Sequence, residues 1–302
     1  MVERVVIAIP TCKRPESLAR LLSAIAALDT DAEISVLVAD NDAAGHQGFD
    51  LCERLAVNYR WPLRAVIEPL RGIAPVRNRL VSEALKSDAQ FIAMIDDDEW
   101  PVPGWIARFI DAQKQTGADV LQGSILFVPE TGGSRPVPDI RHPTGPAEML
   151  QGAGNLLIRR QVVEQMRAPW FDPAFALTGG EDLDFFMRLK RAGCRLGWAD
   201  EAQALGEVAS QRHTLSWRLR RAYSNGNSDM RVLLKYRHGF APVVVESLKI
   251  AGALLLSLPL AIILGLSPNH RHAPLVTFSR AAGKLTAMLG MRCNEYASVH
   301  GE

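Results

Sequence analysis

Hydrophobic runs near the start of the chain predict buried strands that alternate with helices. Residues 5–9 form a run rich in β-branched side chains that Pro10 ends, which is typical of a buried parallel strand. Pro15 then opens a segment in which leucine and isoleucine recur every three or four positions, the period of an amphipathic helix. Further strands are predicted at 34–39, 66–67, 91–95, 120–128 and 154–158, and further helices at 75–85 and 181–191. This alternation predicts an α/β fold with a doubly wound, mainly parallel sheet, whose ligands bind at the carboxyl ends of the strands.

Aspartates follow two of these strands directly. Asp96, Asp97 and Asp98 follow the fourth strand. In an extended backbone alternate side chains point the same way, so we expect Asp96 and Asp98 to face one site and Asp97 to face away. Two carboxylates on one side are hard oxygen ligands suited to Mg²⁺ or Mn²⁺, and three adjacent carboxylates repel one another without a cation. The pattern favours a metal site over a solvated acidic turn. Asp40 and Asp42, after the second strand, either cap a turn or hydrogen-bond a nucleotide.

Other polar residues leave two interpretations open. Glu181 and Asp182 begin a predicted helix, where a carboxylate either stabilises the first turn or removes a proton from a substrate. Arg71 and Arg77 belong either to a basic helix face or to a phosphate site. His213 is either a metal or phosphate contact or an ordinary surface histidine. The Gly/Pro-rich residues 129–146 are long enough for a mobile or substrate-facing loop.

In their order and spacing, six segments resemble the family 2 glycosyltransferases of the bacterial polysaccharide-biosynthesis type. They are IAIPTCKRPESLARLL, VLVADND, RGIAPVRNRL, FIAMIDDDEWPVPGW, GAGNLLIRR and GGEDLDFFMRLKRAGCRLGW. The resemblance runs from the N-terminus to about residue 213. It implies a GT-A fold, in which a nucleotide-sugar-binding α/β domain is joined to an acceptor-binding part, and a transferase domain at 1–210.

The resemblance also implies a donor site. Pro10 and Thr11 would line the nucleotide cleft, and Asp40 would accept a hydrogen bond from the base, normally uracil. Arg71 and Arg77 would lie beside the nucleotide and its phosphates. Residues 39–42 read Ala-Asp-Asn-Asp, whereas many relatives have paired aspartates followed by Gly-Ser, so Asp42 is left without an implied role.

The Asp-x-Asp element of the family corresponds to Asp96 and Asp98, with Asp98 as the direct ligand of Mn²⁺ or Mg²⁺. Asp97 would lie with Asp96 beside the donor, and His213 would be a further metal or diphosphate contact. These assignments imply a metal-dependent hexosyltransferase.

The Glu-Asp pair would supply the catalytic base. Asp182 would deprotonate the acceptor hydroxyl as it attacks the anomeric carbon from the side opposite the leaving group, and Glu181 would lie near the acceptor. The implied reaction is a single inverting displacement from a nucleotide-sugar, with a UDP-sugar expected, to a lipid-linked or polymeric glycan.

The near-neutral formal charge of +1 conceals an uneven distribution. Residues 210–249 carry eight basic side chains against Asp229 and Glu246, a net charge of +6, and residues 1–209 carry −7. Residues 250–266 contain no charged side chain, and Pro259 interrupts them. Because basic residues flank this apolar run on both sides, we expect an in-plane or re-entrant hairpin bent near Pro259 rather than a single crossing. The tail at 211–302 would then hold the protein at the cytoplasmic face of the inner membrane, with a milder amphipathic helix at 275–289.

Several classes of protein are disfavoured. The four cysteines are scattered without a Cys-x-x-Cys pair, which predicts a reducing compartment, and the N-terminal apolar run is short for a signal peptide. Nucleic-acid binding is not expected, because the basic residues carry no recognised motif. A metal-dependent nucleotidyltransferase is disfavoured because no glycine-rich loop with a lysine follows the first strand. A membrane-recruited nucleotide-sugar-binding or scaffold protein without transfer activity is the remaining alternative.

Overall fold

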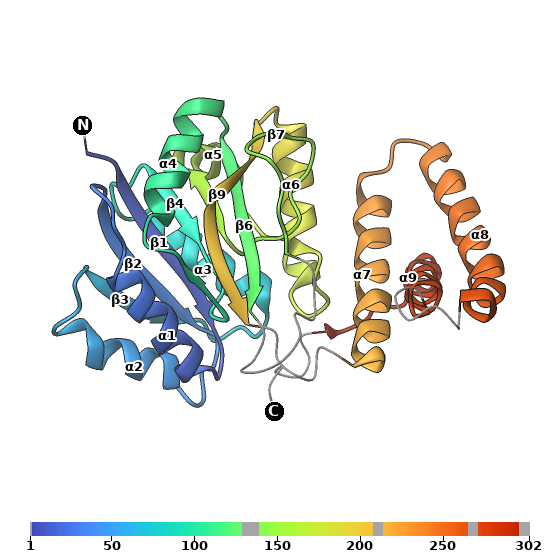
Figure 1. Ribbon diagram of the computed structural model, residues 1–302, viewed down its shortest axis with the longest axis horizontal. Coiled ribbons are helices and arrows are strands. Elements are labelled where there is room, and N and C mark those ends of the chain that lie inside the picture. The colour runs from blue at the N-terminus through green and yellow to red at the C-terminus, as the bar shows by residue number, and fades with distance from the viewer. Residues whose placement is uncertain (1, 129–138, 208–213, 265–270, 296–302) are drawn as a thin grey trace. The chain divides into compact units, whose positions relative to one another are not determined.

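The computed structural model describes residues 2–128, 139–207, 214–264 and 271–295, and the chain divides into two compact units (Figure 1). Unit 1 takes in Met1–Ala176 and Glu181–Val208. Unit 2 takes in Leu177–Gly180 and Ala209–Glu302. His213 and most of the Gly/Pro-rich loop lie outside the described residues.

Unit 1 is an α/β domain built on one sheet, as the alternation of hydrophobic runs predicted. Its elements are β1 Arg4–Thr11, α1 Pro15–Ala26, β2 Glu33–Asp40, α2 Gln47–Ala56, β3 Leu63–Ile67, α3 Ile73–Ala84, β4 Phe91–Met94, β5 Glu99–Pro101, α4 Trp105–Thr116, β6 Val120–Val128, β7 Gly145–Ala147, β8 Leu156–Arg159, α5 Arg160–Gln165, η1 Pro173–Phe175, α6 Glu181–Arg191 and β9 Leu196–Glu207. The strand order is β3-β2-β1-β4-β8-β6-β9-β5, and β7 pairs with β9. The sheet is parallel from β3 to β4 and becomes mixed at β8, which runs antiparallel to both of its neighbours.

Alternating side chains of β1 pack into two separate cores, one on each face of the sheet. Val5, Ile7 and Ile9 lie in the core that α1, α2 and α4 cover. Val6 and Ala8 lie in the core that α3, α5 and α6 cover. Both faces of the strand are therefore buried, which explains why its sequence is continuously hydrophobic rather than alternating. The result is a three-layer domain (Figure 1).

The strand register brings the ends of β1 and β2 to one edge. Thr11, the last residue of β1, pairs with Asp40, the last residue of β2. β4 runs parallel to β1 on its other side, so the acidic residues that follow it leave the sheet at the same edge. This is the carboxyl edge, where open α/β sheets bind ligands.

Unit 2 is helical, with α7 Leu215–Tyr236, α8 Ala241–Leu264 and α9 Ala273–Met288. Helices α7 and α9 cross closely, because a side chain on Gly226 would meet the carbonyl of Arg280 and one on Gly283 would meet that of Tyr223. Asn227 is buried at this crossing, and its amide donates to the carbonyls of Gly283 and Met291.

The hairpin expected at Pro259 is wrong, because α8 runs unbroken through this residue. A proline inside a helix removes one backbone hydrogen bond, but it does not by itself reverse the chain. Within the described ranges α8 is the one helix long and apolar enough to cross a membrane by length and composition, with a mean hydropathy of 2.1 and 11% of its most apolar stretch buried.

Candidate active site

The three aspartates after β4 form a tight turn rather than an extended run. The backbone N–H of Glu99 donates to the carbonyl of Asp96 at 3.1 Å, which closes the turn. The extended geometry expected here is therefore wrong, because the chain must leave β4 and enter β5, which pairs with β9 elsewhere in the sheet. Exposure still alternates along the turn. The side chains of Asp96 and Asp98 are 33% and 25% exposed, whereas that of Asp97 is 8% exposed.

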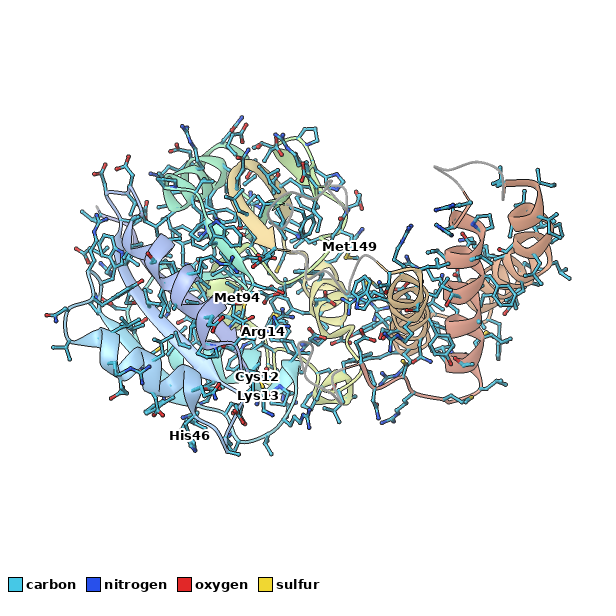
Figure 2. The ribbon with its side chains drawn as sticks, turned by 60° about the horizontal axis from the view of Figure 1, so that its bottom comes forward. Cys12, Lys13, Arg14, His46, Met94 and Met149 are labelled. Carbon is cyan, nitrogen blue, oxygen red and sulfur yellow. The ribbon has the colours of Figure 1, made fainter. Side chains whose placement is uncertain are left out.

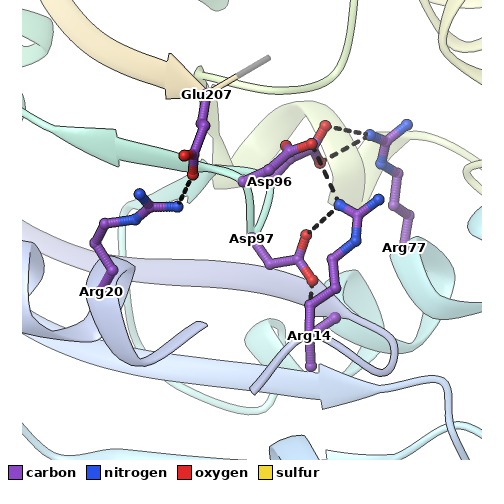
Figure 3. Close-up of polar contacts among 8 residues, drawn as sticks. Arg14, Arg20, Arg77, Asp96, Asp97 and Glu207 are labelled. Atoms are coloured by element: carbon purple, nitrogen blue, oxygen red, sulfur yellow. Dashed lines mark hydrogen bonds and ion pairs between the residues drawn. The ribbon is translucent and has the colours of Figure 1, made fainter. Parts of the chain in front are cut away.

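Arg14 lies in the loop between β1 and α1 (Figure 2) and binds two of these carboxylates (Figure 3). Its Nη1 lies 3.0 Å from Asp97 Oδ1 and 3.2 Å from Asp98 Oδ2. The hydroxyl of Thr11 donates to the other oxygen of Asp97 at 2.8 Å. Burial raises the pKa of Asp97 to about 7, against the lowering effect of Arg14. Asp97 thus ties the acidic turn to the end of β1.

Arg77, on α3, joins the acidic turn to the start of α6. Its Nη1 lies 2.5 Å from Glu181 Oε1. Its Nη2 lies 3.1 Å from Asp96 Oδ1 (Figure 3). Arg77 is buried, with 4% of its surface exposed. The place beside the nucleotide and its phosphates that the resemblance implied for Arg77 stays a prediction; in this structure the guanidinium lies between two carboxylates.

The two acidic residues that begin α6 differ in accessibility. Glu181 is buried and binds Arg77, whereas Asp182 is half-buried. Burial raises the pKa of Glu181 to about 7, and the neighbouring carboxylate of Asp182 adds to the increase, while Arg77 acts in the opposite direction. Asp182 is therefore the member of the pair that a substrate could reach.

The loop after β2 is organised by Asp40, which is fully buried. Its Oδ1 accepts from the backbone N–H of Asp42 at 2.9 Å, and its Oδ2 accepts from that of Phe49 at 2.9 Å. Gly48 packs against this carboxylate, and a Cβ at that position would lie 2.9 Å from Asp40 Oδ2. A contact between Asp40 and a nucleotide base stays a prediction, as does a role for the buried residue Pro10.

Asn41 is a residue that the sequence analysis did not assign. Its Nδ2 donates to the carbonyls of Glu68 and Leu70, and its Oδ1 accepts from the N–H of Gly72 at 2.8 Å. These bonds fix the loop that carries the exposed Arg71. Its position between two aspartates at a strand end was the signal that could have identified it.

Two further unassigned residues support the acidic turn. Glu99 is buried, and burial beside Asp96 raises its pKa well above the ordinary value. Gly154 leaves room for both carboxylates, because a Cβ there would lie 2.9 Å from Glu99 Oε1 and 3.1 Å from Asp96 Oδ2. Next to it, Asn155 is buried and its Oδ1 accepts from the indole N–H of Trp105 at 2.7 Å.

Asp96 and Asp98 fit a metal held partly by substrate. In the part of the chain that the structure describes, no group of three or more His, Cys, Asp or Glu side chains could hold an ion by itself. Mg²⁺ at nucleotide sites is usually held by one or two carboxylates together with substrate phosphates and water. Asp96 and Asp98, two partly exposed carboxylates at the carboxyl edge of the sheet, match this arrangement of carboxylates, substrate phosphates and water.

The mixed α/β sheet with an acidic turn at its carboxyl edge is a GT-A fold. The chain resembles the structure of S. aureus TarS 1–349 in complex with UDP, with a TM-score of 0.54 and 16% identity over 95% of this chain and 92% of that chain. TarS 1–349 in complex with UDP-GlcNAc gives a TM-score of 0.52 and 15% identity over the same shares.

Residues 6–167 match the model of glycosyl transferase family 2, and residues 143–288 match that of glycosyl transferase family group 2. The chain therefore belongs to glycosyl transferase family 2, a family of enzymes that transfer glycosyl groups. It is also 28% identical over 253 residues to the succinoglycan biosynthesis protein ExoM of Rhizobium meliloti (strain 1021). The aligned region covers 77% of this chain and 76% of that relative.

Proposed function

We propose that the protein transfers a sugar from a nucleotide-sugar, with UDP as the expected nucleotide, to a hydroxyl of a lipid-linked or polymeric glycan, with inversion at the anomeric carbon. The observation that carries this proposal is the position of Asp182. It is half-buried and follows Glu181, which Arg77 links to Asp96 of the acidic turn. The complexes of TarS with UDP and UDP-GlcNAc support the choice of donor, and the printed name of ExoM supports a polysaccharide product.

In this mechanism Asp182 accepts the proton of the acceptor hydroxyl as the hydroxyl oxygen attacks the anomeric carbon. The bond between that carbon and the diphosphate oxygen breaks, and its electron pair leaves with the nucleoside diphosphate. Arg71 lies on a loop that Asn41 holds at the same edge of the sheet, and it is proposed to contact the nucleotide. Pro10, Thr11 and Asp40 are proposed to form the nucleotide side of the site.

Asp96 and Asp98 are the residues proposed to hold Mn²⁺ or Mg²⁺, with His213 as a further candidate outside the described residues. When bound, the ion would neutralise charge that develops on the leaving diphosphate. Arg14 holds Asp98 and the buried Asp97 together, so these carboxylates stay in place while the donor enters.

The test is a panel of nucleotide-sugars with Mn²⁺, in which release of nucleoside diphosphate is measured for the wild type and for Asp182→Asn. We expect the variant to bind UDP as the wild type does and to lose about 10²–10⁴-fold in turnover, the range that a general base contributes. The matched control is Asp111→Asn, the same change at an exposed position of α4, which should keep full turnover.

Near-normal turnover of Asp182→Asn would contradict the base assignment. Pyrophosphate release would instead support the nucleotidyltransferase alternative. If the wild type releases no product from any donor, the binding or scaffold alternative is supported.

The metal proposal has its own test. Chelation with EDTA should abolish nucleoside diphosphate release, and added Mn²⁺ should restore it. Asp98→Asn should raise the Mn²⁺ concentration needed for half-maximal activity, because one oxygen ligand is weakened. Full activity in EDTA, measured after exhaustive dialysis, would show that catalysis does not require the ion.

We also propose that α8 lies in the plane of a membrane surface. Glu246, near its start, binds Lys284 of α9, and the neighbouring Ser247 approaches Met288. A helix that crossed the bilayer with its full length would carry Glu246 and Lys249 into the hydrocarbon, which is costly. The uncharged part after Lys249 holds 15 residues to the end of α8, or about 22 Å of helix, short of the roughly 30 Å of a hydrocarbon core.

A further inference from the structure

A buried arginine connects the two acidic elements of the proposed site. The side chain of Arg77 is 5% exposed, and its two terminal nitrogens bind carboxylates from different parts of the chain. Asp96 lies in the turn after β4, and Glu181 begins α6, 104 residues from Arg77. These contacts lie within unit 1.

The guanidinium is held in place from its own helix as well. The next residue on α3, Asn78, accepts from the backbone N–H of Phe171 at 2.9 Å and donates to its carbonyl at 2.7 Å. Arg77 lies over the ring of Phe171, with its central carbon 5.8 Å from the ring centroid. The Asn78 side chain thus attaches α3 to the backbone of the segment before α6. From the same part of α3, the Arg77 side chain extends to the start of α6.

Arginine suits this place because its planar fork presents two N–H groups to two acceptors at once. A lysine has a shorter side chain with a single terminal nitrogen, so it lacks the fork that binds both carboxylates in a fixed geometry. The partner Glu181 is as buried as the arginine, with 3% of its side chain exposed, so neither charge has water as a substitute partner. A cation committed to these two carboxylates has little freedom to turn toward a phosphate.

We infer that Arg77 is a positioning residue that fixes the start of α6, and with it Asp182, relative to the Asp96 turn. This role differs from the donor-binding role that the family resemblance implied for Arg77 beside the nucleotide and its phosphates, and it rests on the proposed function. Through Glu181 the guanidinium sets where the first turn of α6 begins, and through Asp96 it sets where the donor-side carboxylates lie. The distance between the base and the donor then depends on a residue that touches neither substrate.

The first experiment compares Arg77→Lys with Arg79→Lys, the same change on an exposed position of α3 that pairs with Glu83. Turnover, KM for the donor and the Kd for UDP with Mn²⁺ are measured by kinetics and calorimetry. We expect Arg77→Lys to lower kcat by about 100-fold, the effect of a displacement near 1 Å, with the Kd for UDP within about threefold of wild type. Arg79→Lys should match the wild type in all three quantities.

If Arg77 instead contacts a phosphate of the donor, Arg77→Lys should mainly weaken UDP binding and change kcat little. If Arg77→Lys weakens UDP binding in proportion to its loss of kcat/KM, or if kcat is unchanged, the inference is overturned.

A double-mutant cycle guards against simple misfolding of the single variant. The single variants Arg77→Gln and Glu181→Gln each remove one charge of the buried pair, and the double variant removes both charges. If Arg77 acts through Glu181, the arginine change should cost far less kcat in the Glu181→Gln background than in the wild type. Additive losses would contradict this coupling.

One readout does not depend on transfer activity. Amide hydrogen exchange at the first turn of α6 should speed up in Arg77→Lys and not in Arg79→Lys. This result would support the positioning role even if the donor panel finds no transfer, whereas equal exchange in the two variants would overturn it.

Discussion

Glu181 and Asp182 are neighbours in the sequence but lie in different surroundings. Glu181 is buried against Arg77, and burial raises its pKa to about 7, while Asp182 is half-buried. Asp97 and Asp98 differ in the same way, with Asp97 buried against Thr11. In each pair one carboxylate has a structural role in the interior, and its neighbour is accessible for chemistry.

Glu83 illustrates a buried carboxylate whose pKa is lowered instead. Burial alone would raise it, but hydrogen bonds from Lys86 and Arg64, together with the charge of Arg79, outweigh burial and hold the pKa below its ordinary value. Its side chain is 2% exposed, and both terminal bonds are 2.8 Å long.

Glu83→Gln should lower the free energy of unfolding by about 1–2 kcal/mol near pH 7, a loss moderated because the three cations are partly exposed. A lowered pKa stabilises the fold above the ordinary value near 4.3, and this contribution disappears as the pH falls through the folded pKa. Denaturant unfolding at several pH values should therefore show the stabilities of wild type and variant converging as the pH falls from the ordinary pKa through the lowered folded pKa. The surface pair Glu164–Arg160 offers the control, since Glu164→Gln should cost under about 0.5 kcal/mol at any pH. A difference that persists at acid pH would refute the explanation.

The acidic residues could be found from the sequence because they follow predicted strands. Their arginine partners could not, because contacts such as Arg14 with Asp97 and Arg77 with Glu181 span 83 and 104 residues. A local pattern carries no information about which cation reaches a carboxylate across the sheet. The turn at 96–98 was also missed, because the path from β4 to β5 depends on where β9 lies.

Helices α7 and α9 depend on two glycines for their close crossing. A Cβ on Gly226 would lie 2.1 Å from the carbonyl oxygen of Arg280, and one on Gly283 would lie 2.0 Å from that of Tyr223. The buried amide of Asn227 bonds across the same crossing. Small residues here allow the backbones to approach as they do in tightly packed membrane helices.

Gly226→Ala should therefore destabilise unit 2, by about 1–3 kcal/mol as for other overpacked positions, although alanine favours a helix. Hydrogen exchange in α7 and α9 measures the effect. Gly252→Ala in α8 is the control, because nothing lies within 4 Å of its added Cβ, and it should be neutral or slightly stabilising. If both variants exchange alike, the glycine crossing does not hold these helices together.

Some elements with strong periodicity were predicted, but α4 was not, although its buried Trp105, Ile106, Phe109 and Ile110 recur at helical spacing. The predicted helix from Pro15 matches α1, whose buried leucines and isoleucine face the core. Helix α2 went unpredicted although its sequence is amphipathic. It has only 10 residues, and besides the buried Gly48 and Cys52 it packs the partly buried Phe49 and Leu51 against the core. Strand β9 went unpredicted because its residues include alanine, glycine and acidic side chains, which become a strand through pairing with β5, β6 and β7.

At the scale of the whole molecule, units 1 and 2 differ in surface chemistry. The large exposed apolar side chains concentrate on α8, where Leu255, Leu256, Ile262 and Ile263 are each more than 60% exposed. Basic residues at 231, 235 and 237 precede the helix. An apolar helix beside basic side chains matches the interface of a bilayer with anionic lipids.

Leu255→Glu combined with Ile262→Glu should lower binding to vesicles that contain anionic phosphatidylglycerol by more than about tenfold. Each of these exposed aliphatic side chains would contribute about 1.5–3 kcal/mol on insertion into the apolar part of the membrane. Co-sedimentation measures the bound fraction, and release of nucleoside diphosphate from a soluble donor should be unchanged. Val57→Glu, at a position 82% exposed on unit 1, is the control and should bind as the wild type does. Undiminished binding of the double variant would exclude α8 as the contact surface.

The sequence by itself determined the α/β class, the strand ends where acidic residues gather, and the apolar character of the tail, because these depend on local periodicity and composition. Only the tertiary structure decided that the aspartates form a turn, that Arg14 and Arg77 bind them, and that α8 continues through Pro259. The reason is that burial and charge pairing arise from segments far apart in the chain, which meet only once the sheet has assembled.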